Sequence, residues 1–155
     1  LFLSSEHDIM VITSVSAAAV LPLRAEVLRP GQPLSACVFA GDDDPDTRHF
    51  GAIDSQGHIV GVASLYRVAH PDLEGEPQFQ LRGMAMQAGC RGQGLGALLL
   101  AAHEEYASTC GAALIWANAR SAAMAFYRRR GYHTATDEFE LPGIGPHYRV
   151  VKSLR

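Results

Sequence analysis

The sequence predicts an α+β fold, with a central mixed and mostly antiparallel sheet that carries helices on both faces. Two runs rich in branched and aromatic residues, 49–53 and 58–66, flank the turn residues 54–57, which is typical of an antiparallel hairpin. A short apolar run at 113–117 stands between two helical segments, as the strand of a parallel crossover does. Together these two pairings indicate a mixed sheet.

The N-terminal part adds a strand, a helix and a loop. Residues 9–12 are a branched apolar run that predicts a first strand, and a helix is predicted over 17–28. Residues 41–46, GDDDPD, must form a loop, because clustered like charges beside proline fit no packed element. We expect this loop to be solvated, and attraction of a cationic amine is the alternative.

The second half supplies a strand over 79–84 and two closing strands over 132–140 and 148–152. In the first of these, Leu81 and its alternate neighbours share one face, while Arg82 lies on the other face. Arg82 can therefore face a substrate cleft or the outer surface of the sheet.

A long helix is predicted to begin near residue 95. Its apolar residues recur with helical spacing and predict a core-facing stripe. We expect His103 to lie in solvent, where it would be a weak catalytic candidate. The stripe consists of Leu95, Leu98, Leu99, Ala102 and Tyr106.

Residues 81–100, LRGMAMQAGCRGQGLGALLL, read as a strand, a tight turn and the start of that helix. Gly92, Gly94 and Gly96 alternate, so no Cβ blocks a ligand that approaches the backbone. The N–H groups of a helix's first turn are unpaired and carry partial positive charge, which favours a phosphate. Arg91 adds a full charge and donors suited to phosphate oxygens. The turn predicts a phosphate or pyrophosphate site.

Three phosphate-binding patterns compete for this turn. A P-loop requires Gly-Lys-Ser/Thr, which does not occur here. Residues 92–97, GQGLGA, fit a dinucleotide-binding G-x-G-x-x-A, but the next strand ends at 116–118, WAN, without the expected carboxylate. The third pattern, Arg/Gln-x-x-Gly-x-Gly/Ala, is met by residues 91–96, RGQGLG.

With this third pattern the sequence resembles the GNAT superfamily of acyl-CoA-dependent N-acyltransferases, in which the turn holds the pyrophosphate of acetyl-CoA. Residues 81–86, LRGMAM, resemble the family's fourth strand, whose last residues hydrogen-bond the pantetheine arm as another strand would. Residues 113–120, ALIWANAR, resemble its fifth strand and exit, and 125–132, AFYRRRGY, resemble its A-x-x-F-Y-x-x-x-G-F/Y helix end.

The resemblance implies a GNAT-like acyl-CoA N-acyltransferase fold, with acetyl-CoA as co-substrate and no metal. It also implies that Tyr127 protonates the departing sulfur, although this residue can instead serve packing. Asn118 and Arg120 match positions that commonly contact the coenzyme, or they are ordinary helix-entry residues. The implied coenzyme-binding residues are Met84, Ala85, Met86, Arg91, Gly92, Gln93, Gly94, Leu95, Gly96, Ala97, Asn118, Arg120 and Tyr127.

Acyl transfer to an amine requires a base, because a lysine-like amine has a pKa of about 10.4 and its deprotonation at pH 7 costs about 4–5 kcal/mol. Glu138 and Glu140 share one side of a predicted strand and are candidate catalytic bases, or else the solvent side of an edge strand. Arg82 and His147 are candidates for binding the acceptor. A base that acts through ordered water would leave no signature in the sequence.

Composition narrows the class of partner. The chain has 155 residues, is 48% hydrophobic and carries a net charge of −3, which predicts one globular domain and neither nucleic acid nor membrane as partner. Three cysteines without a C-x-x-C pair imply no disulfide framework or zinc site, so a reducing cytoplasm is expected. Because the chain begins with Leu, residues 1–8 can be upstream sequence. A single N-acetyltransferase (GNAT) domain is expected over 9–155.

The expected function is transfer of the acetyl group of acetyl-CoA to a primary amine of a small-molecule or peptide acceptor. Direct transfer is expected, since no cysteine sits in an activated-nucleophile context. A non-catalytic acyl-CoA-binding sensor or interaction module on the same fold is the alternative, and a dinucleotide-dependent enzyme is the runner-up enzyme class. Dimers are frequent in the family, so a homodimer is a further expectation.

Overall fold

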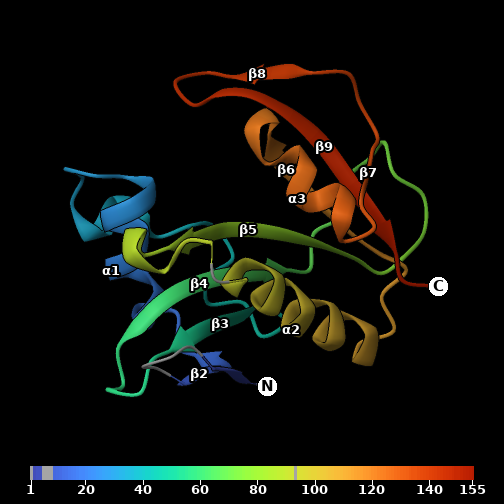
Figure 1. Ribbon diagram of the computed structural model, residues 1–155. Helices are drawn as coiled ribbons and strands as arrows, with labels where there is room; N and C mark the ends of the chain where they lie inside the picture. Colours follow the sequence, from blue (N-terminus) through green and yellow to red (C-terminus); the bar gives the residue numbers. More distant parts are fainter. Residues whose placement is uncertain (1, 5–8, 93) are drawn as a thin grey trace.

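The computed structural model describes residues 2–4, 9–92 and 94–155. One sheet runs through the molecule in the order β1-β2-β3-β4-β5-β6-β9-β7, and β8 pairs with β9 (Figure 1). Only β5 and β6 pair in parallel within this described part, so the predicted mixed, mostly antiparallel sheet is confirmed. The strands are β1 (Phe2–Ser4), β2 (Ile9–Val15), β3 (Arg48–Ile53), β4 (Ile59–Tyr66), β5 (Gln78–Met86), β6 (Leu114–Arg120), β7 (His133–Thr134), β8 (Phe139–Leu141) and β9 (Gly145–Ser153).

The helix predicted over 17–28 is present but irregular, because 3₁₀, α and π turns follow one another. Pro22 lies inside this segment, and it lacks the N–H that a regular α-helix needs. The helical segments are η1 (Ala18–Val20), α1 (Leu21–Leu23), η2 (Arg24–Leu28), η3 (Leu34–Cys37), η4 (Ala88–Cys90), α2 (Leu95–Thr109), η5 (Ser121–Ala123) and α3 (Met124–Arg129). None of those described is long and apolar enough to cross a bilayer.

Helices cover both faces of the sheet, as predicted. Successive side chains of a strand point to opposite faces, and β4 shows the consequence. Val62 packs in one cluster with Val20 and Leu23 of the first helical segment. Its neighbour Ala63 belongs to a different cluster, together with Leu99 of α2.

The parallel pairing of β5 and β6 is short. Residues 78–80 pair with 114–116, after which β5 continues beside β4 and β6 continues beside β9. In Figure 1 the half of the sheet that contains β2–β5 and the half that contains β9 converge on the right and spread apart on the left. The sheet therefore divides at the C-terminal ends of β5 and β6.

The predicted strand over 132–140 is wrong in its middle. In this range the short strands β7 and β8 pair with β9, and after the Ala135 N–H, which donates to the Arg149 carbonyl at 2.8 Å, the chain leaves the sheet until β8. The Thr136 hydroxyl accepts a hydrogen bond from the Arg149 N–H at 3.0 Å, so a side chain replaces the carbonyl that a continuous strand would offer. The last strand, β9, is correspondingly longer than the predicted 148–152.

Helix α2 buries a stripe that differs from the predicted one, and His103 is the main correction. Instead of lying in solvent, His103 is fully buried, and its Nε2–H donates to the Ala63 carbonyl at 2.7 Å. Burial lowers the pKa of His103 to about 3, so the ring is neutral. A neutral imidazole with one carbonyl partner fits an apolar site. The polarity of histidine alone does not reveal that it is buried here. The buried residues of α2 are Leu95, Gly96, Leu99, Leu100, His103 and Ala107.

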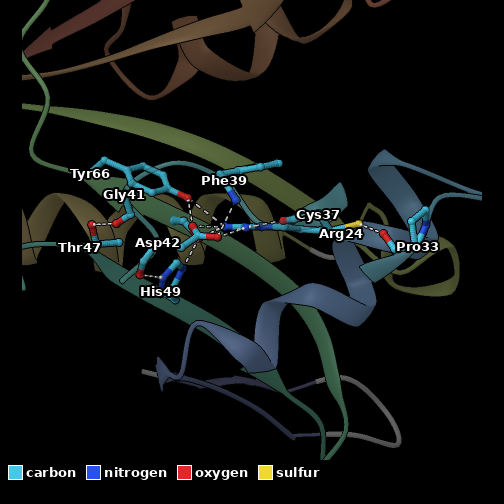
Figure 2. Close-up of polar contacts among 10 residues, drawn as sticks. Arg24, Pro33, Cys37, Phe39, Gly41, Asp42, Thr47, His49 and Tyr66 are labelled. Carbon is cyan, nitrogen blue, oxygen red and sulfur yellow. Dashed lines mark hydrogen bonds and ion pairs between the residues drawn. The ribbon is translucent and has the colours of Figure 1, made fainter. Parts of the chain in front are cut away.

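The acidic loop 41–46 is not wholly solvated, because Asp42 is buried (Figure 2). Its carboxylate accepts hydrogen bonds from Arg24 Nη1 at 2.7 Å and from the Tyr66 hydroxyl at 2.5 Å. Burial raises the pKa of Asp42, but the hydrogen bonds from Arg24, Tyr66 and the Phe39 N–H outweigh it and hold this pKa below its usual value. A fully buried guanidinium requires a counter-charge, and this requirement brings the loop inward.

The same network extends to β3 and β4. Arg24 Nη2 donates to Ser64 Oγ at 3.0 Å. His49 Nε2 contacts the Asp42 carbonyl at 3.0 Å and therefore carries the proton, so His49 Nδ1 accepts from the Ser64 hydroxyl at 2.6 Å. Burial and the hydrogen bond to Asp42 raise the pKa of Tyr66 to about 12. These contacts fasten the first helical segment and the acidic loop to the sheet.

Candidate active site

A pocket of about 360 Å³, here called the cleft pocket, opens where β5 and β6 separate. Its walls come from these two strands, from α3 and from β9. Residues far apart in the sequence meet here, and most of them are predicted site residues. Those predicted residues are Arg82, Met84, Met86, Asn118, Arg120, Tyr127 and His147.

Strand β5 carries a bulge beside the cleft pocket. Ser64 pairs with Arg82 and Val62 pairs with Ala85, so Gly83 and Met84 together oppose one residue of β4. Gly83 has φ +66°, a conformation that glycine adopts without strain. After residue 80, the edge of β5 that faces β6 forms no ladder in the portion that the structure covers. The backbone groups of this edge are open to a ligand that adds as a strand. The side chain of Ala85 is buried with Val62 on the sheet face that the first helical segment covers.

The glycine turn lies directly before α2. Gly92 and Gly94 have φ +81° and +77°, and a Cβ at either position would meet nothing within 4 Å. Gly94 is the N-cap, and no described side chain caps the helix, so within the described residues the first N–H groups of α2 are open to an anion. Arg91 is exposed beside the turn, and the predicted site residue Gln93 lies outside the described residues.

Gly96 has an additional packing role. A Cβ at this position would lie 3.3 Å from Met86 Cε and 3.3 Å from the Phe126 ring, so the glycine allows α2, β5 and α3 to approach one another closely. Leu95 is buried against Ala52, and therefore it can offer only its backbone to a ligand. Ala97 follows on the same turn and is half-buried.

Tyr127 lines the cleft pocket from α3 and is 8% exposed. The rings of Phe126 and Tyr132 stand edge-on to it, with centroids at 5.1 Å and 5.4 Å. Burial raises the pKa of Tyr127 to about 12, so its hydroxyl is protonated at neutral pH. The two roles predicted for Tyr127, packing and proton donation, are therefore compatible. Its ring packs against Phe126 and Tyr132 while the residue also lines the cleft pocket.

Two further residues bring polar atoms to the cleft pocket. Asn118 Oδ1 is buried and has no hydrogen-bond partner among residues 2–4, 9–92 and 94–155. His147 Nδ1 lies 2.7 Å from the Gly145 carbonyl and must donate to it, so Nε2 is the acceptor nitrogen of the neutral ring. His147 is buried, stacks on Phe139 and stands opposite Arg120 in the β6–β9 register.

The predicted bases Glu138 and Glu140 are exposed and do not line the cleft pocket. Glu138 Oε2 accepts a hydrogen bond from the Ser121 hydroxyl at 2.7 Å, and Ser121 directly follows the pocket residue Arg120. Glu140 stands opposite Pro146 in the β8–β9 pairing. The structure therefore places Glu138 beside the pocket and Glu140 farther along the hairpin.

A second pocket of about 520 Å³, here called the outer pocket, adjoins the first. The two pockets share four lining residues, among them Arg82 and Gly83. The outer pocket adds Arg29 and Phe39, which the sequence did not single out. No motif marks these residues, because their position depends on how the segment from 24 to 42 folds against the sheet.

Comparison with known proteins identifies the family. A family model described as the acetyltransferase (GNAT) family matches residues 20–132. The chain belongs to the GNAT family of acetyltransferases. The predicted resemblance is thereby confirmed. The N-acetyltransferase YitI of Bacillus subtilis (strain 168) is 29% identical over 144 residues, which cover 93% of this chain and 96% of YitI.

Solved structures share the GNAT fold across nearly the whole chain. Escherichia coli ElaA matches with a TM-score of 0.73 at 17% identity, covering 93% of this chain and 99% of its own. A GCN5-related N-acetyltransferase from Kribbella flavida matches with a TM-score of 0.73 at 18% identity, and the match covers 94% of this chain and 98% of that one. A chain of the NatC complex bound to Gag peptide and CoA matches with a TM-score of 0.75 at 14% identity, and the match covers 94% of this chain and 99% of that one. At these identities the likeness concerns the fold.

Proposed function

We propose that this GNAT protein is an N-acetyltransferase that transfers the acetyl group of acetyl-CoA directly to a primary amine. One observation carries the proposal: Tyr127 lines the same pocket as the open edge of β5. Met86 connects this pocket to the first turn of α2, since it contacts the position of a Gly96 Cβ. One continuous surface can therefore bind the thioester and the phosphates of acetyl-CoA and place Tyr127 as the proton donor.

We assign the pyrophosphate of the coenzyme to the first N–H groups of α2 and to Arg91. The pantetheine arm fits the free edge of β5 from Met84 to Met86, where unpaired backbone groups can bind it as a strand. Asn118 Oδ1 supports this assignment, because a buried oxygen without a partner is costly and an amide N–H of the arm would satisfy it.

Acetyl-CoA supplies a thioester carbon to which the amine nitrogen bonds as the carbon–sulfur bond breaks. The Tyr127 hydroxyl donates a hydrogen bond to the sulfur as it gains negative charge. With a pKa of about 12 for Tyr127 and about 8.5 for a thiol, full proton transfer to a free thiolate is uphill by about 5 kcal/mol. Hydrogen-bond donation is therefore the main contribution that we assign to Tyr127.

We propose His147 as the group that takes the proton from the amine. Its Nδ1–H is held by the Gly145 carbonyl, which leaves the Nε2 lone pair as the acceptor. The ring lines the cleft pocket, whereas Glu138 and Glu140 do not. The two glutamates are retained as alternative bases that would act through water.

Thiol release tests the proposed function. The purified protein is mixed with acetyl-CoA and a panel of amines that includes small amines, amino acids and peptides with free N-termini. We expect coenzyme A to appear in stoichiometric amounts with an N-acetylated product for at least one class of amine. Coenzyme binding without thiol release across the panel would instead favour the non-catalytic acyl-CoA-binding module.

A further inference from the structure

We infer that the acceptor amine carries an oxyanion, a carboxylate or a phosphate, which the outer pocket binds through Arg29 and Arg82. The inference rests on the proposed function, because it names the class of amine that the site accepts. It concerns the outer pocket, where Arg29 and Phe39 join the predicted residue Arg82.

The outer pocket has an unbalanced positive charge. Arg29, Arg82 and Arg120 all line it, and none of the described aspartates or glutamates does. In the described part of the chain, arginines form ion pairs at Arg24 and Arg149, and the three lining arginines form none. Arg24 lies close by, but its charge is already offset by Asp42. An anion that enters this pocket therefore meets guanidinium groups without displacing a carboxylate.

The Phe39 ring holds two of the three lining guanidinium groups in place, those of Arg29 and Arg82. The Arg82 and Arg29 guanidinium carbons lie 4.8 Å and 5.6 Å from the centre of the ring, and Arg24 lies 4.0 Å from it. Arg82 also stands 5.4 Å from the Tyr66 ring. Stacking on aromatic faces offsets part of the repulsion between the like charges and limits their freedom. The donors are therefore oriented before a ligand arrives, which reduces the entropic cost of binding.

The position of the outer pocket suits an acceptor rather than the coenzyme phosphates. It joins the cleft pocket at Arg82 and Gly83, whereas the first turn of α2 contacts the cleft at Met86 through Gly96. These two junctions lie at opposite ends of the free edge of β5. The proposed base His147 stands between β6 and β8 and lines the cleft pocket. An amine held by its anionic group in the outer pocket can thus extend into the cleft.

Gly83 keeps the junction between the pockets open. A Cβ here would lie 3.2 Å from the Phe39 ring and 3.3 Å from Arg24 Nε. Arg24 Nε is itself buried and has no hydrogen-bond partner within the described residues. The glycine thus leaves a further cationic group, with a spare donor, directly behind the wall of the pocket.

Matched pairs of amines test the inference. The protein is saturated with coenzyme A and titrated by calorimetry with glycine and glycinamide, β-alanine and β-alaninamide, and O-phosphoethanolamine and ethanolamine. Because charge-assisted hydrogen bonds to oriented guanidinium groups are strong, at least one anionic member should bind about ten-fold or more tightly than its neutral partner. The carboxylate and phosphate pairs show which oxyanion the pocket prefers.

Arg29→Gln and Arg82→Gln should each reduce this preference to about three-fold or less, with coenzyme A affinity close to that of the wild type. Arg29→Lys should recover part of the preference, since it restores a charge without the planar fork. Arg67→Gln is the control, because Arg67 is exposed and lies outside both pockets.

Equal binding of charged and neutral partners, or no binding of any anionic member to the coenzyme-loaded protein, would overturn the inference. An equal loss of preference in Arg67→Gln would also overturn it, because that result reflects net charge alone. If coenzyme A itself does not bind, the proposed function fails instead, and the two failures are therefore distinguishable.

Discussion

Tyr127 shows how one buried side chain can both pack and take part in chemistry. Tyr127→Phe should keep the ring contacts with Phe126 and Tyr132 and remove the hydroxyl from the cleft pocket. We expect kcat to fall by roughly 10- to 100-fold, because a hydrogen bond to the developing sulfur charge is lost. The dissociation constant of acetyl-CoA, measured by calorimetry, should change by less than about three-fold. Parallel losses in kcat and coenzyme affinity would indicate a packing role instead.

The choice of base can be tested by comparing three glutamine variants. His147→Gln should lower kcat on the order of 100-fold, because the Nε2 acceptor disappears. Glu138→Gln and Glu140→Gln, which lie outside the cleft pocket, should stay within about three-fold of the wild type. A loss on the order of 100-fold in either glutamate variant, with near-normal kcat in His147→Gln, would assign the base to the glutamate.

His103 should make the fold sensitive to acid. The unfolded chain binds a proton at this residue below a pH of about 6.5, whereas the folded protein resists protonation until a pH of about 3. Stability is therefore lost as the pH falls through this interval, by about 2 kcal/mol between pH 7 and pH 5. Urea unfolding of His103→Gln should lack this component, and the exposed control His133→Gln should retain it. Identical pH dependence in wild type and His103→Gln would refute the assignment.

Asp42 is predicted to stabilise the fold by compensating a buried charge. Asp42→Asn keeps the shape but leaves the guanidinium of Arg24 without a counter-charge, which should lower the free energy of unfolding by about 3–5 kcal/mol. Asp43→Asn removes the same charge from an exposed neighbour and should cost less than about 0.5 kcal/mol. Denaturant unfolding at pH 7 measures both. Similar losses in the two variants would mean that the loop responds to net charge.

At the scale of elements, the turn before α2 can be tested against the other end of the same helix. Gly94 and Gly111 have φ +77° and +73°, and a Cβ at either would meet nothing within 4 Å. Leucine at either position should therefore cost a similar 1–2 kcal/mol of stability. Only Gly94→Leu should also weaken acetyl-CoA binding, by at least about ten-fold, because its side chain occupies the space that we assign to the pyrophosphate. Equal coenzyme affinity in the two variants would remove the phosphate from this turn.

The elements that carry motifs were predictable from sequence, and the others were less so. The strand–turn–helix around Gly94 and the hairpin of β3 and β4 follow local rules of backbone conformation and periodicity, and the structure contains both. The first helical segment became irregular at Pro22, and the segment after Tyr132 paired only at its ends. The second departure depends on a tertiary partner, because the hydroxyl of Thr136 bonds the backbone of β9.

At the scale of the whole molecule, the two sides of the site differ in how far the sequence predicts them. The cleft pocket is built mostly from predicted residues, because the backbone conformations at the division of the sheet impose glycines and a recognisable order of residues. The outer pocket depends on Arg29 and Phe39, whose positions follow from the burial of Arg24 against Asp42. A buried ion pair between distant residues has no periodic signature, so this half of the site emerges only in three dimensions.

The central claim is that the division of the sheet between β5 and β6 holds acetyl-CoA. Calorimetric titration of the purified protein with acetyl-CoA, alongside NAD and NADP, tests this claim most directly. We predict one acetyl-CoA bound per chain with an affinity in the micromolar range or tighter, and no heat of binding with either dinucleotide. Binding of a dinucleotide in place of acetyl-CoA, or no binding of acetyl-CoA at all, would contradict the account.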